Sequence, residues 1–346
     1  MHLINKYTAR QREFTFIELK REKISATFMD YGATILSIFT QDKEGVSESI
    51  LLAYNNLHSY VENDMYVNAT IGPFSGRIDN ATFKIDDVEH RVDKNVKGQN
   101  INLHGGSETI AFKFFDYLVE ECEDHDKLTF TYHKKDLASK FPGKQKYKIV
   151  YWLYDTELLI EFIAKTDEDT IVNLTNHAYF NLSGNLKRDI LHHNVSINSS
   201  KTLELNEEAA PIGVKSSVGT FLDYRELQEV QSNFFDGIYD TSAKGIDHPF
   251  MLDDVGFEHK QVVLEDPISK RRMEVYTTYP CVVVYTHNYP DEKELLFGAT
   301  HKQHMGICFE AQFEPNGMNV SGLNDSILRK DNKYYHKTLL KFSVKE

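Results

Sequence analysis

Hydrophobic and polar residues alternate with a period of two along much of this chain. The apolar positions of these runs are rich in β-branched and aromatic residues, and clusters of Gly, Asn, Asp and Lys separate one run from the next. This pattern is typical of half-buried β-strands. It predicts strands at residues 14–19, 24–28, 33–40, 128–132, 147–154, 158–165, 194–198, 261–264, 273–278, 281–286 and 338–344.

Helical periodicity is rare by comparison. Residues 223–230 place Leu227 and Val230 on one helical face, with Asp223 in a capping position, and this predicts one short peripheral helix. So many strands with so little helix predict an all-β fold, a large antiparallel β-sandwich. A nucleotide-binding βαβ fold is not favoured, because the chain has neither a Gly-x-Gly-x-x-Gly turn nor a phosphate-loop pattern.

The uninterrupted strand pattern also indicates how many domains the chain forms. No repeat of solenoid or propeller length and no Pro/Gly/Ser-rich linker divides the 346 residues. Large β-sandwiches often hold a chain of this length as one unit. We therefore expect a single domain spanning residues 1–346, with the termini and the lysine-rich stretch 134–148 as exposed loops.

Composition supplies a core and argues against several classes of partner. Hydrophobic residues make up 41% of the chain, including 22 Phe and 19 Tyr, which suffices for a substantial core and the walls of a cleft. The net charge of −13 would repel a phosphate backbone, so we expect no nucleic-acid partner. No stretch approaches the roughly 18 apolar residues of a membrane span and no signal-peptide pattern opens the chain, so we expect a cytoplasmic protein with no membrane partner.

The cysteines give no structural framework. Cys122, Cys281 and Cys308 are odd in number and far apart in the sequence. Neither a disulfide scaffold nor a zinc cluster can be derived from such spacing. We expect three reduced thiols, two of them in strands.

Four segments concentrate His, carboxylate and amide side chains that an ordinary sandwich core does not need. Taken singly, a histidine beside glycines or an Asp-His-Pro sequence is common turn chemistry. The segments are Asn-Leu-His-Gly-Gly at 102–106, Asn-Leu-Thr-Asn-His-Ala-Tyr-Phe-Asn-Leu-Ser-Gly at 173–184, Gly-Ile-Asp-His-Pro-Phe at 245–250, and Gly-Ile-Cys-Phe-Glu-Ala-Gln-Phe-Glu-Pro-Asn at 306–316.

Glu310 is the strongest candidate from residue type alone. Strand alternation puts it on the same side as Cys308 and Gln312, within a largely apolar strand. A buried carboxylate without a partner is costly, so such a residue usually has a partner or a purpose.

Together, in this order and at this spacing, the four segments resemble the aldose 1-epimerase (galactose mutarotase) family. The most specific piece is Asn-x-Thr-Asn-His-x-Tyr-Phe-Asn-Leu-x-Gly at 173–184, and similarity extends along nearly the whole chain. The resemblance implies a β-supersandwich. It also implies an isomerase that interconverts the α and β anomers of free aldohexoses such as galactose and glucose, with no metal or other cofactor.

The resemblance further implies the catalytic roles. In this family a glutamate takes the proton of the C1 hydroxyl, a histidine donates a proton to the ring oxygen, and the opened aldehyde rotates and recloses. The matching residues are Glu310 as base and His177 as acid, and His104 matches a second histidine at the ring oxygen. With reference pKa values of about 4.3 and 6.5, an ionised carboxylate and a protonated imidazole can coexist near neutral pH, so these roles require no exotic pKa shift.

Substrate-binding residues come from the same resemblance. Arg77 and Asp247 match residues that bind sugar hydroxyls, and Asn176 and Tyr179 are further candidates, the tyrosine as a face on which the sugar stacks.

Two departures from the family pattern concern the substrate. Many relatives read Gly-Arg-x-Ala-Asn-Arg-Ile where this chain has Pro73 in place of the first arginine and Gly76 in place of the asparagine. Some relatives also carry a sugar-contacting glutamine at the position of Val283. The acid and the base are unaffected, but the sequence decides neither the preferred aldose nor whether the protein is a monomer or a homodimer.

Three other interpretations remain open at this stage. His104, His177 and Glu310 could form a two-histidine, one-carboxylate iron site, although such sites usually take two ligands from one short His-x-Asp/Glu pair. Glu310 and Asp247 could be the two carboxylates of a glycosidase. A non-catalytic carbohydrate-binding sandwich would bind sugars by aromatic stacking, but would leave the acid and the base unexplained.

Overall fold

The structure, a computed structural model, describes residues 2–135, 140–234, 237 and 243–345. Its strands form three large antiparallel sheets and several two-stranded ribbons. The first sheet has the order β1-β2-β3-β4-β5 and holds the N-terminal residues. Its strands are β1 (His2–Ala9), β2 (Arg12–Lys20), β3 (Ile24–Met29), β4 (Thr34–Gln41) and β5 (Ser47–Ser49).

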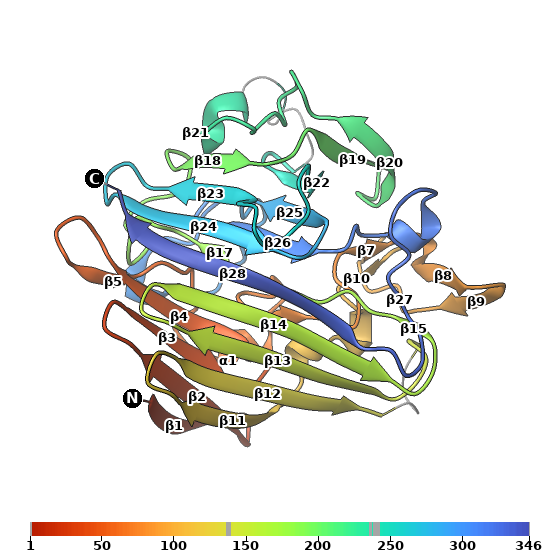
Figure 1. The fold of residues 1–346 in the computed structure, drawn as a ribbon, viewed down its shortest axis with the longest axis horizontal. Helices are drawn as coiled ribbons and strands as arrows, with labels where there is room; N and C mark the ends of the chain where they lie inside the picture. Colours follow the sequence, from red (N-terminus) through yellow and green to blue (C-terminus); the bar gives the residue numbers. More distant parts are fainter. Residues whose placement is uncertain (1, 136–139, 235–236, 238–242, 346) are drawn as a thin grey trace.

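The largest sheet has nine strands in the order β11-β12-β13-β14-β28-β24-β23-β18-β21. Its long strands cross the front of the molecule in Figure 1. They are β11 (Asp116–Glu121), β12 (Asp126–Lys134), β13 (Gln145–Leu153), β14 (Glu157–Thr166), β18 (Asn194–Ile197), β21 (Gln228–Glu229), β23 (Val262–Glu265), β24 (Arg271–Thr277) and β28 (Tyr334–Val344).

A six-stranded sheet, in the order β17-β26-β25-β22-β19-β20, carries most of the polar segments singled out above. Its strands are β17 (Tyr179–Phe180), β19 (Lys201–Leu205), β20 (Pro211–Ser216), β22 (Asp247–Met251), β25 (Cys281–Tyr285) and β26 (Ile307–Gln312). The ribbons are β6 (Thr70–Ile71) with β16 (Thr175–Asn176), β7 (Arg77–Ile78) with β10 (Asn102–Leu103), β8 (Thr82–Ile85) with β9 (Val88–Arg91), and β15 (Thr170–Ile171) with β27 (Ile327–Leu328).

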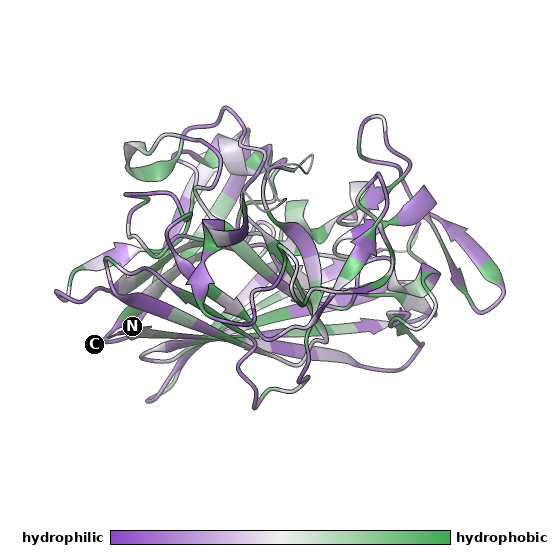
Figure 2. Ribbon diagram, turned by 90° about the horizontal axis from the view of Figure 1, so that it is seen from above, coloured by the Kyte–Doolittle hydropathy of each residue, from purple (hydrophilic) through white to green (hydrophobic). Residues whose placement is uncertain are grey.

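The hydrophobic core joins all three sheets. One cluster of buried side chains includes Ile17 of β2, Phe130 of β12 and Phe250 of β22. In Figure 2 the hydrophobic stretches gather on the strands inside the molecule, while the outer loops are mostly hydrophilic. The predicted all-β antiparallel sandwich is confirmed.

All eleven predicted strands are present, but the predicted helix at 223–230 is wrong. Residues Gln228–Glu229 form β21 and pair with β18, so strand pairing overrides the weak helical pattern. Asp223 does not cap a helix, because its carboxylate accepts hydrogen bonds from the Gly219 amide and the Arg225 guanidinium. Among the described residues one α-helix is present, α1 (Leu57–Val61), which is short and lies elsewhere in the sequence.

The predicted exposed loops are also corrected in part. The N-terminus forms β1, and its side chains are exposed on both faces, so its sequence lacks the alternation that reveals a strand. Near the C-terminus, residues Tyr334–Val344 form β28. The lysine-rich stretch 134–148 ends in β13, and residues 136–139 lie outside the described residues.

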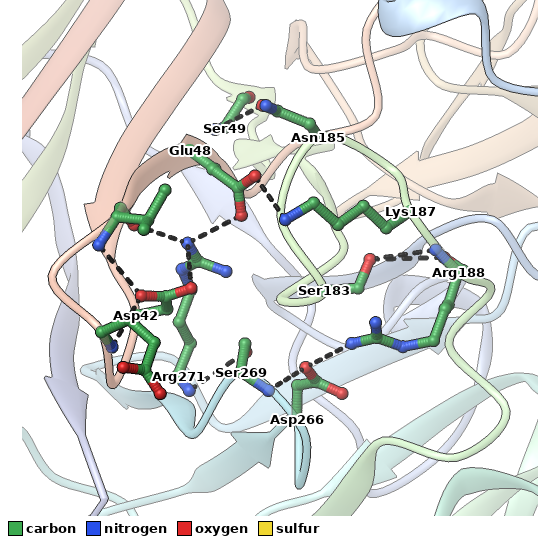
Figure 3. A network of polar contacts seen from close by, with 12 residues as sticks. Asp42, Glu48, Ser49, Ser183, Asn185, Lys187, Arg188, Asp266, Ser269 and Arg271 are labelled. Carbon is green, nitrogen blue, oxygen red and sulfur yellow. Dashed lines mark hydrogen bonds and ion pairs between the residues drawn. The ribbon is translucent and has the colours of Figure 1, made fainter.

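A buried arginine ties the N-terminal sheet to the nine-stranded sheet (Figure 3). Arg271, at the start of β24, is 2% exposed, and it donates to the Val46 carbonyl at 2.9 Å and to Glu48 at 3.1 Å. Gly184, the last residue of the 173–184 segment, lies against this pair with φ +78°, and a Cβ there would be 2.2 Å from Glu48 Oε2. The pair therefore explains why this position requires glycine.

No helix among the described residues has the length and apolar character needed to span a bilayer. Cys122, Cys281 and Cys308 are free thiols, as predicted, and the last two lie in β25 and β26.

Candidate active site

A cavity of about 360 Å³ opens over one face of the six-stranded sheet, beside the β7–β10 ribbon. Side chains from β17, β22, β25 and β26 contribute to its walls, and loops close the remaining sides. The lining residues are Asp64, Met65, Tyr66, Gly76, Arg77, Leu103, His104, His177, Tyr179, Leu205, Ala209, Pro211, Asp247, Pro249, Val283, Tyr285, Tyr289, Asp291, Glu310, Gln312 and Pro315.

His177 and Glu310 form a buried pair in the wall of this cavity. Glu310 lies in the middle of β26, and His177 lies between β16 and β17, which pairs with β26. Nε2 of His177 is 3.4 Å from Oε1 of Glu310, and both residues are at most 5% exposed. Backbone hydrogen bonds to residues 68 and 69 hold His177 in place. An imidazole and a carboxyl group, side chains that often act in acid–base catalysis, are thus held next to each other at the cavity.

His104 completes the group from the other side. It directly follows β10, and its ring lies edge-on to the His177 ring at a centroid distance of 5.5 Å. The Gly76 amide donates to Nδ1 of His104, so the proton of a neutral His104 is on Nε2. Gly105 permits the tight turn, because a Cβ there would be 2.8 Å from Pro73 Cδ.

Burial shifts the pKa values of Glu310, His177 and His104 in the directions that favour their uncharged forms. It raises the pKa of Glu310 to about 8, with the Asp247 carboxylate adding to the effect and Arg77 opposing it. It lowers the pKa of His177 to about 4, and that of His104 well below its usual range. An ionised Glu310 and a protonated His177 therefore do not coexist in the way their reference pKa values suggest, because a low-dielectric site disfavours both the carboxylate and the imidazolium.

Arg77 and Asp247 lie together in the cavity wall. Arg77 is in β7 and Asp247 is the first residue of β22, and Nη2 of Arg77 is 3.3 Å from Oδ2 of Asp247. Both side chains keep some exposure toward the cavity, at 24% and 17%. A paired guanidinium and carboxylate present donors and acceptors suited to sugar hydroxyls.

The other two predicted binding residues differ in their placement. The Tyr179 ring lies 5.0 Å from the His177 ring and nearly parallel to it, and its hydroxyl donates to the Met65 carbonyl. Tyr179 therefore supports His177 in the cavity wall. Asn176 lies outside the cavity lining, because its side chain faces the interior and donates to the Asn68 carbonyl and to the Tyr151 hydroxyl.

The structure adds cavity residues that the sequence did not single out as site residues. The Tyr66 ring is 4.7 Å from the His104 ring, in a loop with positive φ that carries no periodic signal. Gln312 also lines the cavity, and its place two residues after Glu310 on the same strand face was the available signal.

The family departures fall in different places. Gly76 and Val283 line the cavity, and Val283 pairs directly with Glu310 across β25 and β26. Pro73 does not line it, and packs behind His104 against the Gly105 backbone.

His104, His177 and Glu310 also have a spacing that a metal ion could bridge. One ligand atom from each of His104, His177 and Glu310 lies within 4.8 Å of the other two.

Comparison with known proteins identifies relatives along the whole chain. Residues 15–341 match the family model described as aldose 1-epimerase. Human galactose mutarotase is 31% identical over 330 residues, covering 94% of this chain and 93% of that protein. Aldose 1-epimerase of Haemophilus influenzae is 29% identical over 335 residues, covering 95% and 96%. The crystal structure of galactose 1-epimerase from Lactobacillus acidophilus has a TM-score of 0.86 at 24% identity, covering 100% of this chain and 99% of that one.

Proposed function

This chain belongs to the aldose 1-epimerase family, and from that premise we propose that it interconverts the α and β anomers of free aldohexoses such as galactose and glucose. The observation that supports this most directly is the buried contact of 3.4 Å between His177 and Glu310 at the cavity wall. Anomer exchange needs one group that removes a proton and one that supplies a proton, and this pair provides both.

The proposed reaction moves two protons and breaks one bond. Glu310 takes the proton of the C1 hydroxyl as His177 donates a proton from Nε2 to the ring oxygen, and the C1–O5 bond breaks to give the open-chain aldehyde. Rotation about the C1–C2 bond presents the other carbonyl face. Ring closure reverses both transfers, so each residue regains its starting protonation state.

The raised and lowered pKa values are compatible with this scheme. At neutral pH the pair holds one proton, and burial places it on Glu310 in the empty site. The reactive arrangement has the proton on His177 and the same total charge as the arrangement with the proton on Glu310. It arises when the proton passes from Glu310 to His177. His104 donates its Nε2–H to the ring oxygen without needing a charge.

The Arg77–Asp247 pair in the cavity wall is assigned to binding hydroxyls of the sugar. The Arg77–Asp247 pair offers guanidinium donors and carboxylate acceptors beside the acid and the base. Such contacts orient the ring, and orientation is itself a large contribution to catalysis. An Asp247 carboxylate held in an ion pair suits hydroxyl binding better than the proton donation that a glycosidase would require of it.

Substitution of the acid and the base tests this assignment. We expect Glu310→Gln and His177→Asn each to lower kcat by at least about 100-fold, because each removes a proton-transfer group. The rate of α-glucose consumption, measured with an excess of a β-specific glucose oxidase, reports the loss.

Glu314→Gln is the matched control for Glu310→Gln. Glu314 is a buried glutamate four residues along the chain and lies outside the cavity lining. His193→Asn is the control for the histidine, since His193 is buried in another part of the fold. Turnover that survives in either active-site variant would contradict the assignment.

The other interpretations predict different results in the same preparations. A metal-dependent site would lose activity on exhaustive chelation and would contain stoichiometric metal. A glycosidase would release nitrophenol from nitrophenyl glycosides in a Glu310-dependent manner. A binding module would bind galactose without accelerating anomer exchange.

A further inference from the structure

The cavity wall contains one carboxamide, that of Gln312. Within the described part of the chain, no other Asn or Gln lines the cavity. Gln312 is the last residue of β26, and strand alternation turns its side chain to the same face as Glu310. The mechanism proposed above gives this amide no role.

Both polar atoms of the Gln312 amide lack a partner. Oε1 and Nε2 are buried and make no hydrogen bond to any described residue, and the residue as a whole is 0% exposed. Asn102, Asn176 and Gln261 each leave only the amide oxygen unpaired, so Gln312 is the one buried amide among the described residues with both polar atoms unpaired. Asn173 exchanges two hydrogen bonds with the Phe313 backbone, and Asn68 donates to the Leu52 carbonyl while accepting from the Tyr179 amide. An unpaired buried amide is destabilising, so a ligand is the natural partner of Gln312.

The neighbours of Gln312 offer its amide no hydrogen bond, although they cover both of its polar atoms in this structure. A Cβ on Gly76 would lie 3.3 Å from Nε2 of Gln312, so the amide packs beside a residue that has no side chain of its own. Val283, which pairs with Glu310, is apolar. Nε of Arg77 is likewise buried and unpaired among the described residues. The amide and the Arg77 guanidinium are therefore polar groups in this wall with unused hydrogen-bonding capacity.

We propose that Gln312 binds two neighbouring hydroxyls of the aldose on the side of the ring away from the anomeric carbon. This inference rests on the proposed function. A carboxamide presents an acceptor and a donor side by side, so one hydroxyl can donate to Oε1 while the next accepts from Nε2. Two residues along a strand span about 7 Å, which is comparable with the width of a sugar ring. With C1 at Glu310, the amide meets the hydroxyls whose configuration distinguishes one aldose from another.

Gln312→Leu tests the contact by removing both polar atoms at similar volume. We expect the KM for glucose to rise about tenfold or more, with a much smaller change in kcat, because the amide binds hydroxyls that do not react. The midpoint of urea denaturation should not fall, since an unpaired buried amide is lost. Gln312→Met repeats the test with a second unbranched side chain.

Gln261→Leu is the matched control. Gln261 is a buried glutamine outside the cavity, and its Nε2 donates to the carbonyls of Asp254 and Gly256. Its loss should lower the denaturation midpoint and leave KM unchanged. A structural role for Gln312 would give this same result, and would overturn the inference.

The monodeoxy derivatives of glucose locate the hydroxyls. For the wild type, kcat/KM should fall about tenfold when a hydroxyl bound by Gln312 is missing, and the Gln312→Leu protein should show little further loss with that sugar. Equal losses in both proteins for every derivative would overturn the inference while leaving the proposed function intact. A wild-type protein that turns over no aldose would overturn both.

Discussion

At the scale of single residues, burial decides how the acid and the base share their proton. His177 and Glu310 touch in a site that excludes most solvent, where either isolated charge is unfavourable. The sequence identified both residues through the family pattern, but not this property. Sequence spacing carries no information on solvent exclusion, which arises only when distant segments pack around the pair.

The shared proton predicts a bell-shaped pH dependence of kcat/KM. Below about pH 4 the pair takes up a second proton and Glu310 no longer acts as base. Above about pH 8 the pair loses its only proton and His177 no longer acts as acid. Between these limits the pair keeps one proton, so we expect a broad plateau.

Background-corrected polarimetric rates with glucose across this pH range provide the measurement. An alkaline limb near pH 6.5, the reference value for histidine, would show that burial does not control the pair. The Glu310→Gln protein serves as the control for catalysis by the rest of the molecule.

At the scale of elements, the alternation of hydrophobic and polar residues predicted where the strands lie. It did not predict which strands pair with one another. The face of β26 that carries Glu310 followed from its sequence, because side chains alternate along a strand. The same rule explains why Asn176 and His177, which are adjacent, do not share the cavity. The β18–β21 pairing that replaces the predicted helix depends on residues more than 30 positions apart, and no local pattern reports it.

The contact between β5 and β24 gives a prediction about stability. Arg271→Met should lower the free energy of unfolding by about 3 kcal/mol, because it leaves the buried Glu48 with Lys187 as its remaining ion-pair partner. Urea denaturation measures the difference.

Arg329→Met is the control for this variant. Arg329 also pairs with two carboxylates, those of Asp86 and Asp169, but it is 41% exposed, so its loss should cost at most about 1 kcal/mol. Similar effects of the two substitutions would contradict the structural role given to Arg271.

At the scale of the whole molecule, the core argues for one cooperative unit. We propose that the chain folds as a single domain, because one hydrophobic cluster draws side chains from all three large sheets. The absence of a linker in the sequence suggested this organisation, whereas the strand order β14-β28-β24 at the centre of the nine-stranded sheet depends on long-range pairing that sequence periodicity does not encode.

Unfolding at equilibrium tests the single-domain proposal. We expect coincident transitions from far-ultraviolet circular dichroism, which reports all sheets, and from the fluorescence of Trp152, the only tryptophan, in β13. Two separated transitions would show that parts of the sandwich fold independently.

The sequence predicted which residues belong to the candidate site, but not the cavity that they form. His104, His177, Glu310, Arg77, Asp247 and Tyr179 line one cavity, while their roles there stay a prediction. Tyr66 and the unpaired Gln312 amide could be recognised only once the loops and β26 were placed around the same space.

Polarimetry of freshly dissolved α-galactose and α-glucose, with and without the purified, chelator-treated protein, tests the central claim most directly. We predict a faster approach to the anomeric equilibrium with the wild-type protein, an unchanged equilibrium rotation, and no such acceleration with Glu310→Gln. A folded wild-type protein that leaves the rate of rotation unchanged for these and other aldoses would contradict the assignment of this site to anomer exchange.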